Sequence, residues 1–252
     1  MDKSQYIFGI RAVIEAIEAG RDIDKVLVRK DLGGDLGREL TARIKEYGIV
    51  SQKVPVEKLN RITMKNHQGV IALLSPVTYY RLETLVPELY DRGAVPFIVV
   101  LDGITDTRNF GAIARTCECA GVDAVVIGER GSVSVTADAV KTSAGALLHI
   151  PVCRERSIAD AVRFLRESGI HVVGASEKTD TLYTEQDMTV PTAVVMGAED
   201  VGLSDEVIRA CDSLAAIPVI GHIESLNVSV AAAVMVYEGV RQRLAAGFAA
   251  GK

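Results

Sequence analysis

The sequence lacks the features that would place it among membrane, secreted or disulfide-stapled proteins. No apolar run reaches the roughly 18 residues needed to span a bilayer. The N-terminal stretch MDKSQYIFGIR has no apolar core of the kind found in signal peptides. The four cysteines show neither zinc-binding spacing nor a disulfide framework, so we expect buried, inert thiols. These absences predict a cytoplasmic protein that spans no membrane.

Several common enzyme signatures are also missing. The glycine patterns GxGxxG and GxxxxGK[ST] do not occur, which argues against a dinucleotide fold and against a P-loop. No GxSxG nucleophile elbow is present either. The histidines lie far apart without the spacing of metal ligands, at His67, His149, His171 and His222. We therefore expect no metal centre.

Charge is distributed unevenly along the 252 residues. The net charge is −5, but residues 1–80 carry +3 and the remainder −8. A basic excess confined to the first third is expected if that part contacts phosphates.

Hydrophobic patterning predicts two α/β domains. Residues 1–76 read as a small domain, with helices in GIRAVIEAIEAG and GRELTARIKEYG and strands in KVLVRK, IVSQKV and GVIALLS. Residues 77–95 lie in a stretch with Pro76, Pro87, Gly93 and Pro96, and we interpret them as a linker with one short helix. Residues 96–252 alternate six strands with helices, which predicts a doubly wound parallel sheet.

Polar clusters follow three of the predicted strands, at the sheet edge where ligands bind in such folds. They are LDGITDTRNFGAIAR (101–115), VVMGAEDVGL (194–203) and IPVIGHIESLNVSVAAAV (217–234). Each has an ordinary structural explanation as a helix cap, a glycine turn or a polar loop. The number of polar groups exceeds that need: Ser225 and Asn227 both stand before the last helix, which requires one capping side chain.

Together the clusters resemble the SpoU/TrmH branch of the SPOUT RNA methyltransferases. The segments NFGAIAR (109–115), MGAEDVGL (196–203) and IPVIGHIESLNVSVA (217–231) fit the three motifs of that family, and KTSAGALLHIPV (141–152) fits a further segment. The resemblance implies a parallel-sheet domain tied in a deep trefoil knot, an obligate homodimer, and S-adenosyl-L-methionine as cofactor. By carry-over, Gly197, Ile217 and Leu226 line the adenosine pocket, largely through backbone groups. The further residues expected at the cofactor pocket are Met196, Val219, Gly221, Ser225 and Asn227.

The resemblance also implies the chemistry. The residue corresponding to Arg115 is the proposed catalytic group of the family. A guanidinium is a poor base, so we expect Arg115 to clamp a phosphate and stabilise the developing alkoxide. Asn109 would fix the ribose or Arg115. Glu199 would orient either Arg115 or the turn of the second motif (196–203), in which Glu199 itself lies.

The first 76 residues look like the ribosomal-protein-like RNA-binding domain of the bacterial 23S rRNA guanosine 2′-O-methyltransferases of the RlmB type, through YIFGIRAV and NHQGV (66–70). Arg11 stands where relatives often have His. The resemblance predicts RNA contacts at Arg11, Asn66, His67 and Gln68. Backbone-tracking cations are expected at Lys25, Arg29, Lys30, Lys53, Arg61 and Lys65.

The sequence thus predicts a methyltransferase acting on the ribose 2′-OH of a guanosine in 23S ribosomal RNA. Two alternatives remain: a relative that acts on transfer RNA by the same chemistry, and a catalytically silent RNA-binding assembly factor.

Overall fold

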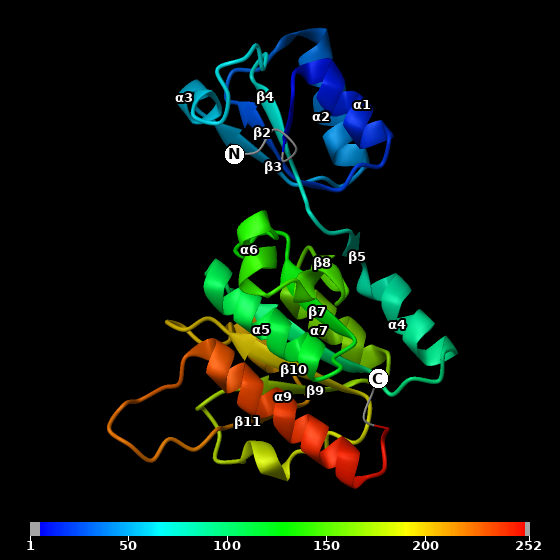
Figure 1. Ribbon diagram of the computed structural model, residues 1–252, viewed down its shortest axis with the longest axis vertical. Helices are drawn as coiled ribbons and strands as arrows, with labels where there is room; N and C mark the ends of the chain where they lie inside the picture. Colours follow the sequence, from blue (N-terminus) through cyan, green and yellow to red (C-terminus); the bar gives the residue numbers. More distant parts are fainter. Residues whose placement is uncertain (1–5, 250–252) are drawn as a thin grey trace. The chain divides into compact units, whose positions relative to one another are not determined.

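The computed structural model describes residues 6–249 and divides the chain into two compact units, Met1–Thr78 and Tyr79–Lys252. Residues 1–5 and 250–252, which the two predicted domains include, lie outside the described residues. Each unit has a sheet of its own (Figure 1). Within the described range no helix is both long and apolar enough to cross a bilayer.

The first unit is a four-stranded sheet in the order β1-β4-β2-β3. Its strands are β1 (Tyr6–Phe8), β2 (Ile23–Arg29), β3 (Ser51–Val54) and β4 (Val70–Leu74), and its helices are α1 (Ile10–Glu18), α2 (Gly34–Glu46) and α3 (Val56–Asn60). Strand β4 runs antiparallel to β1 and to β2, whereas β2 and β3 are parallel.

Alternation of side chains along these strands creates two small cores, one on each face of the sheet. Val26 of β2 packs with buried side chains of α1 and α2. Its neighbour Leu27 points the other way and packs with Ile71 and with Leu59 of α3. The short helix α3 covers part of this second face, and Tyr6, Phe8 and Leu73 on it are only partly buried.

The second unit is a seven-stranded sheet in the order β11-β9-β10-β6-β7-β8-β5, and every neighbouring pair is parallel. Its strands are β5 (Tyr79–Tyr80), β6 (Phe97–Asp102), β7 (Ala124–Gly128), β8 (Val152–Glu155), β9 (His171–Ala175), β10 (Thr192–Gly197) and β11 (Ser213–Ala215). Its α-helices are α4 (Leu82–Asp91), α5 (Thr107–Cys119), α6 (Ala137–Thr142), α7 (Ile158–Glu167), α8 (Asp205–Ala210) and α9 (Val228–Ala245). Two short 3₁₀ turns, η2 (Ala146–Leu148) and η3 (Tyr183–Glu185), complete the unit.

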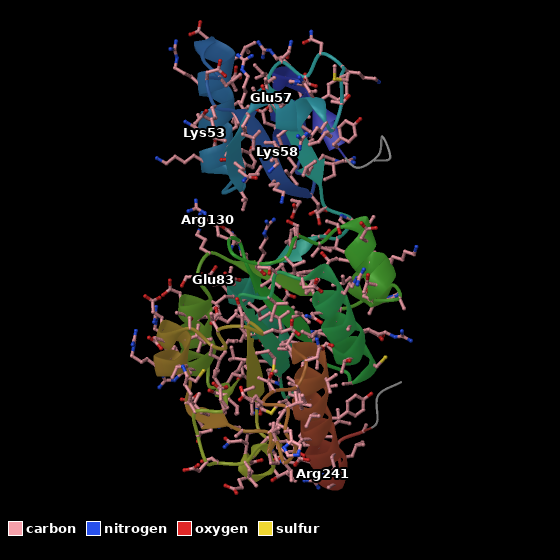
Figure 2. All side chains as sticks on the ribbon, turned by 90° about the vertical axis from the view of Figure 1, so that its left-hand side faces the viewer. Lys53, Glu57, Lys58, Glu83, Arg130 and Arg241 are labelled. Atoms are coloured by element: carbon pink, nitrogen blue, oxygen red, sulfur yellow. The ribbon has the colours of Figure 1, made fainter. Side chains whose placement is uncertain are left out.

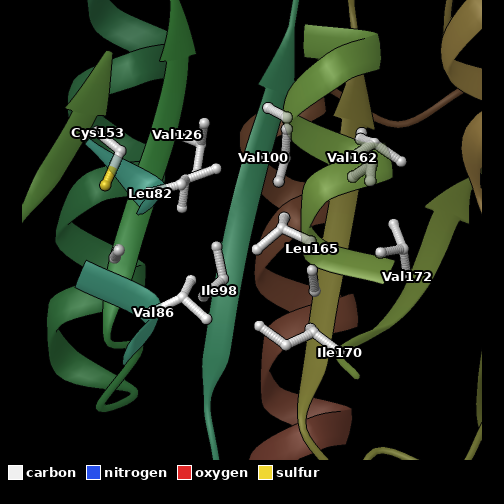
Figure 3. Packing of buried hydrophobic residues seen from close by; sticks show 14 of the residues in the cluster. Leu82, Val86, Ile98, Val100, Val126, Cys153, Val162, Leu165, Ile170 and Val172 are labelled. Carbon is white, nitrogen blue, oxygen red and sulfur yellow. The ribbon is translucent and has the colours of Figure 1, made fainter. Parts of the chain in front are cut away.

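Helices cover both faces of this sheet. On one face α4, α7 and α8 pack against buried strand residues such as Ile98 and Val172 (Figure 3). On the other face α5 lies against α9. There Gly239 of α9 comes so close to Phe97 that a Cβ atom would lie 2.6 Å from the phenyl ring. The predicted class, a parallel-sheet α/β domain beside a small N-terminal α/β domain, is confirmed.

Most of the segment predicted as a linker, residues 79–95, belongs to the second unit, and residues 77 and 78 end the first. Strand β5 pairs with β8, and α4 buries Leu82, Leu85, Val86 and Leu89 in the core. These leucine and valine positions follow helical spacing. The short helix expected in this segment is therefore α4, which accommodates Pro87, but it belongs to the core of the second unit and not to a linker.

The last predicted strand, LAAIPV (214–219), is also shorter than expected. Strand β11 ends at Ala215, and only Ala216 adds an isolated bridge, to Leu182. Beyond it the chain leaves the sheet as an extended loop, seen in orange in Figure 1. This loop leads to α9, the last helix.

Candidate active site

The candidate site lies where two neighbouring strands send the chain to opposite faces of the sheet. Strands β6 and β10 are adjacent, and their last residues, Asp102 and Gly197, are directly paired. The chain continues from β6 to α5 on one face and from β10 towards α8 on the other. In open α/β sheets, the crevice outside the carboxyl ends of such strands is the usual ligand site.

Three predicted site residues meet at this edge. The side-chain amide of Asn227 donates hydrogen bonds to Asn109 Oδ1 (3.0 Å) and to Glu199 Oε1 (2.6 Å). The residues come from the start of α5, the turn after β10 and the start of α9. Their convergence supports the interpretation of the three sequence clusters as a single site.

Helix caps hold these residues in place. Asp106 caps α5 by accepting hydrogen bonds from the backbone N–H groups of Arg108 and Asn109, both at 2.9 Å. Asn227 caps α9, because its Oδ1 accepts from Ser229 N at 3.0 Å. Asn227 therefore performs two functions: its oxygen caps the helix and its nitrogen joins the two other side chains.

The carboxylate of Glu199 lies at the N-terminus of α9. It accepts from Val228 N at 3.3 Å as well as from Asn227. A negative charge is favoured at a helix N-terminus, where N–H groups are unpaired and the helix dipole is positive. Glu199 thus links the turn after β10 to the last helix.

The turn after β10 is unusually tight. Ala198 and Gly202 exchange two backbone hydrogen bonds, at 3.1 and 2.9 Å. A Cβ atom on Gly197 would lie 2.2 Å from the carbonyl carbon of Gly202 and 2.3 Å from Leu203 N. Gly197 is therefore required by the packing of its own turn, a reason that the sequence pattern did not reveal.

Asp102 adds a tie that sequence reasoning missed. Its Oδ2 accepts from Ser204 N at 2.8 Å, joining the end of β6 to the segment before α8. The only signal was an Asp-Gly pair at the end of a strand, which is common in turns.

The third sequence cluster forms an exposed loop. Among the described residues, those from 217 to 226 make no backbone–backbone hydrogen bond. Ile220 and Ile223 are 96% and 77% exposed, and Ser225 is exposed as well. Exposed apolar side chains beside free backbone donors and acceptors are the composition of a surface that binds a partly apolar ligand or another chain.

Arg115 lies outside the cluster formed by Asn109, Glu199 and Asn227. It is exposed on α5, six residues beyond Asn109, which corresponds to about 9 Å along the helix and about 1.7 turns around it. Among the described residues Glu199 makes no ion pair with Arg115. The predicted pairing is therefore not found; the carboxylate binds Asn227 and Val228 instead.

In the first unit the residues predicted to contact RNA differ in exposure and in hydrogen bonding. His67 is buried: its Nδ1 accepts from Gly69 N at 3.0 Å, and its Nε2 lies 2.9 Å from Asn60 Oδ1. The Gln68 side-chain oxygen accepts from Ile10 N at 3.0 Å, at the start of α1. These two side chains are used by the fold itself, whereas Arg11 and Asn66 are exposed.

The thiols differ from one another. Burial raises the pKa of Cys117, Cys153 and Cys211 to about 12. Cys119, at the end of α5, is exposed, so the expectation of four buried thiols is wrong for this residue. No group of three or more His, Cys, Asp or Glu side chains within residues 6–249 could hold a metal ion.

A cavity of about 440 Å³ in the second unit lies away from the candidate site. Its lining mixes charges of both signs, from Arg81, Glu83, Glu155, Arg156 and Asp160. None of the predicted site residues lines it. Hydrogen bonds, and not this cavity, therefore bring the predicted site residues together.

Comparison with known proteins gives matches to both units. A family model described as the SpoU rRNA Methylase family matches residues 96–237. A second model, described as RNA 2′-O ribose methyltransferase substrate binding, matches residues 6–80.

Individual relatives cover nearly the whole chain. A protein of Staphylococcus haemolyticus assigned to the TrmH family of tRNA/rRNA methyltransferases is 37% identical over 94% of this chain and 95% of its own. The SpoU methyltransferase AviRb from Streptomyces viridochromogenes, in complex with AdoMet, aligns with a TM-score of 0.59 and 26% identity, over 95% of this chain and 90% of that one. An AdoMet-bound rRNA methyltransferase from Sinorhizobium meliloti aligns with a TM-score of 0.60 and 26% identity, over 94% and 87%.

Proposed function

The chain belongs to the SpoU rRNA methylase family, and from this premise we propose that it methylates a ribose 2′-OH of a guanosine in 23S ribosomal RNA. The observation that carries the proposal is the junction of Asn109, Glu199 and Asn227 at the carboxyl ends of β6 and β10. The same chain carries a unit that matches the family's RNA substrate-binding model. An intact polar cluster argues against a catalytically silent assembly factor.

The residues at this edge suit S-adenosyl-L-methionine, the cofactor bound in the relatives from Streptomyces viridochromogenes and Sinorhizobium meliloti. Residues 217–226 offer backbone N–H and C=O groups that no other described backbone group uses. Half-exposed Leu226 and Val219 supply apolar surface for an adenine ring. Met196 is buried, so it would contribute through its backbone. In the trefoil knot of the family this loop would be one of the knot loops. The knot stays a prediction.

When bound, the cofactor supplies an electrophilic methyl group, so the protein has to position the ribose and assist loss of the 2′-OH proton. Asn109 lies in the first turn of α5 and would orient the ribose. Glu199 is already bound to α9 and would keep the turn after β10 in place. Arg115 is exposed and makes no ion pair with a described residue, so it is available to clamp a phosphate of the RNA and to stabilise the developing alkoxide.

A homodimer completes the proposal. Val230, Tyr237 and Leu244 recur every seven residues on α9 and are 49%, 49% and 48% exposed. That spacing places them along one side of the helix. They form an exposed apolar stripe, and a second copy of the chain would cover it. A partner could bring its own Arg115 to the site, which would explain why Arg115 stands outside the cluster.

The decisive experiment uses two reactions. Each contains the protein and tritiated S-adenosylmethionine, one with a transcript of 23S rRNA and the other with a transcript of transfer RNA. A 2′-O-methyl group blocks alkaline cleavage on its 3′ side. Label in an alkali-resistant dinucleotide beginning with guanosine, from 23S rRNA, is the expected result. Label only in transfer RNA would favour the alternative that the name of the staphylococcal relative allows. Cofactor binding without transfer to either RNA would favour the silent factor.

Arg115 offers a sharper test of the mechanism. Arg115→Lys keeps the positive charge but loses the planar, bidentate hydrogen-bonding group. We expect the methyl-transfer rate at saturating RNA to fall about tenfold or more, with cofactor affinity unchanged by calorimetry. A lysine variant that kept most of its rate would rule out the bidentate clamp.

A further inference from the structure

One face of the first unit's sheet is only partly covered. Helix α3 shields Leu27, Val54 and Ile71, which are buried. Towards the β1 edge the same face continues with Tyr6 and Phe8, which are half-buried. Their ring centroids lie 6.1 Å apart, and Lys65 Nζ lies 5.7 Å from the centroid of the Phe8 ring.

Strand register extends this aromatic edge across the sheet. Tyr6 pairs with Leu73 on β4, and Leu73 pairs with Lys25 on β2. Side chains directly opposite one another on neighbouring strands share a face. An aromatic, an aliphatic and a cationic side chain therefore form one continuous row.

The row ends in a groove of about 710 Å³ between the sheet and α3. Leu27, Leu73 and Ile62 give it an apolar lining. The groove is further lined by Lys25, Lys58 and Arg61, with Glu57 as its one carboxylate, and by Gln52 and Pro55. Figure 2 labels Lys58 and Glu57 on α3 and Lys53 on the neighbouring strand β3. Three cations against one anion favour a negatively charged occupant.

The groove is separate from the turn at residues 66–68, where the sequence predicted contacts with RNA. At residues 66–68, His67 and Gln68 are hydrogen bonded within the fold. In the groove Arg61 is exposed, and the one hydrogen bond of Lys58 to a described residue is a long contact of 3.5 Å to Gln52 Oε1. Lys58 and Arg61 can therefore exchange partners at little cost, whereas Lys25 lies 3.8 Å from Asp24 and the side chains of the turn are held by the fold.

We propose that this face, formed by Tyr6, Leu73 and the groove beside α3, binds unpaired nucleotides of the RNA substrate. Bases stack on Tyr6 and against the apolar lining, while Lys58 and Arg61 hold the flanking phosphates. The chemistry is that of single-strand recognition, in which aromatic side chains on an open sheet carry the bases and cations follow the backbone. The inference rests on the proposed function, since it identifies the surface by which that function would select its RNA.

The test measures direct binding, so that it does not depend on catalysis. Full-length protein is titrated into a fluorescein-labelled 12-nucleotide single-stranded RNA and into a 12-base-pair RNA duplex, at several salt concentrations. The double variant Lys58→Ala/Arg61→Ala is compared with Arg38→Ala/Lys45→Ala. The control removes the same charge from exposed positions of α2, the helix on the opposite face of the sheet.

We expect the groove variant to bind the single strand about tenfold more weakly at low salt, and its log–log salt slope to fall by about 1.4, or about 0.7 for each lost phosphate contact. The control should change affinity less than twofold. Tyr6→Leu, which keeps apolar packing, should weaken binding about fivefold or more without changing the salt slope, because stacking is lost and no charge is removed.

Three outcomes would overturn the inference: equal losses in the groove variant and the control, no binding of the single strand by the wild type, or tighter binding of the duplex with the same loss in the groove variant. Methyl transfer to 23S rRNA is assayed in parallel. Transfer that persists at the wild-type rate and KM in the groove variant would leave the proposed function standing and reject only this surface.

Discussion

At the residue scale, Asn227 links folding and chemistry through opposite ends of one amide. Its oxygen caps α9 and its nitrogen binds Asn109 and Glu199. Substitutions can separate these contributions, because serine caps a helix as well as asparagine does but has no amide to donate.

We predict that Asn227→Ser leaves the free energy of unfolding nearly unchanged and lowers the methyl-transfer rate about tenfold or more. Asn227→Ala should in addition lose about 1 kcal/mol of stability, the usual value of a helix cap. Urea unfolding and single-turnover transfer measure the two quantities. Full activity in the serine variant would show that the junction of the three side chains has no part in the reaction.

Gly197 gives a second prediction at this scale. Gly197→Ala would place a methyl group 2.2 Å from the Gly202 backbone, and the clash should destabilise the protein by about 2 kcal/mol. Gly221→Ala is the matched control, since nothing lies within 4 Å of its added Cβ, and it should change stability by less than about 0.5 kcal/mol. Equal unfolding midpoints for the two variants would contradict the tight turn.

At the scale of elements, the sequence predicted best where one signal dominates. Continuous apolar runs predicted β6, β7 and β10, which are buried on both faces. A short helix was expected at α4, but the prolines around it favoured a linker over a part of the core. At β11 the predicted strand was too long, because Ile217 and Val219 continue an apolar run that has no strand to pair with. Strand pairing is a long-range property, so local composition could not locate the end of β11.

The candidate site shows the same division. Sequence motifs identified Asn109, Glu199 and Asn227, but not that Asn227 would bind the other two, because they are separated by up to 118 residues. The burial of His67 could not be foreseen for a related reason: a polar turn residue looks exposed until the position of Asn60 is known.

An ion cluster fixes the first turn of α4 to the sheet and gives a prediction of pH dependence. Arg81 lies 3.0 Å from Glu129 and 3.4 Å from Glu155, and Glu155 Oε1 accepts from Leu82 N at 2.9 Å. Burial raises the pKa of Glu155, although Leu82 and Arg81 oppose the shift.

A raised folded-state pKa means that the folded protein binds this proton more tightly than the unfolded chain does. The stabilisation from Glu155 is therefore fully present below the unfolded-state pKa and is lost as pH rises through the folded-state value. Glu155→Gln cannot titrate, so the stability of wild type relative to this variant should increase as pH falls from 7 to 4. Urea unfolding across that range measures the difference, with exposed Glu83→Gln as the control. Parallel pH curves for wild type and Glu155→Gln would refute the raised pKa.

At the scale of the whole molecule, the exposed stripe on α9 leads to a prediction about assembly. Tyr237→Glu would place a charge in the middle of the apolar surface, and dimer dissociation should become at least about tenfold easier because a buried, unpaired charge is costly. Sedimentation velocity over a dilution series measures this. Tyr47→Glu is the control, since Tyr47 is also 49% exposed but lies in the first unit. An unchanged sedimentation coefficient for Tyr237→Glu, matching that of wild type, would place the interface elsewhere.

The long span between Asn109 and Asn227 also sets an order of events during synthesis. The first unit and all strands from β5 to β11 precede α9 along the chain, and domains fold as units as they leave the ribosome. A nascent chain would therefore carry its first unit and the strands of its second sheet before Asn227 has been made. Asn227 is the residue whose amide joins Asn109 to Glu199. Translation thus assembles the part that binds RNA ahead of the part that modifies it.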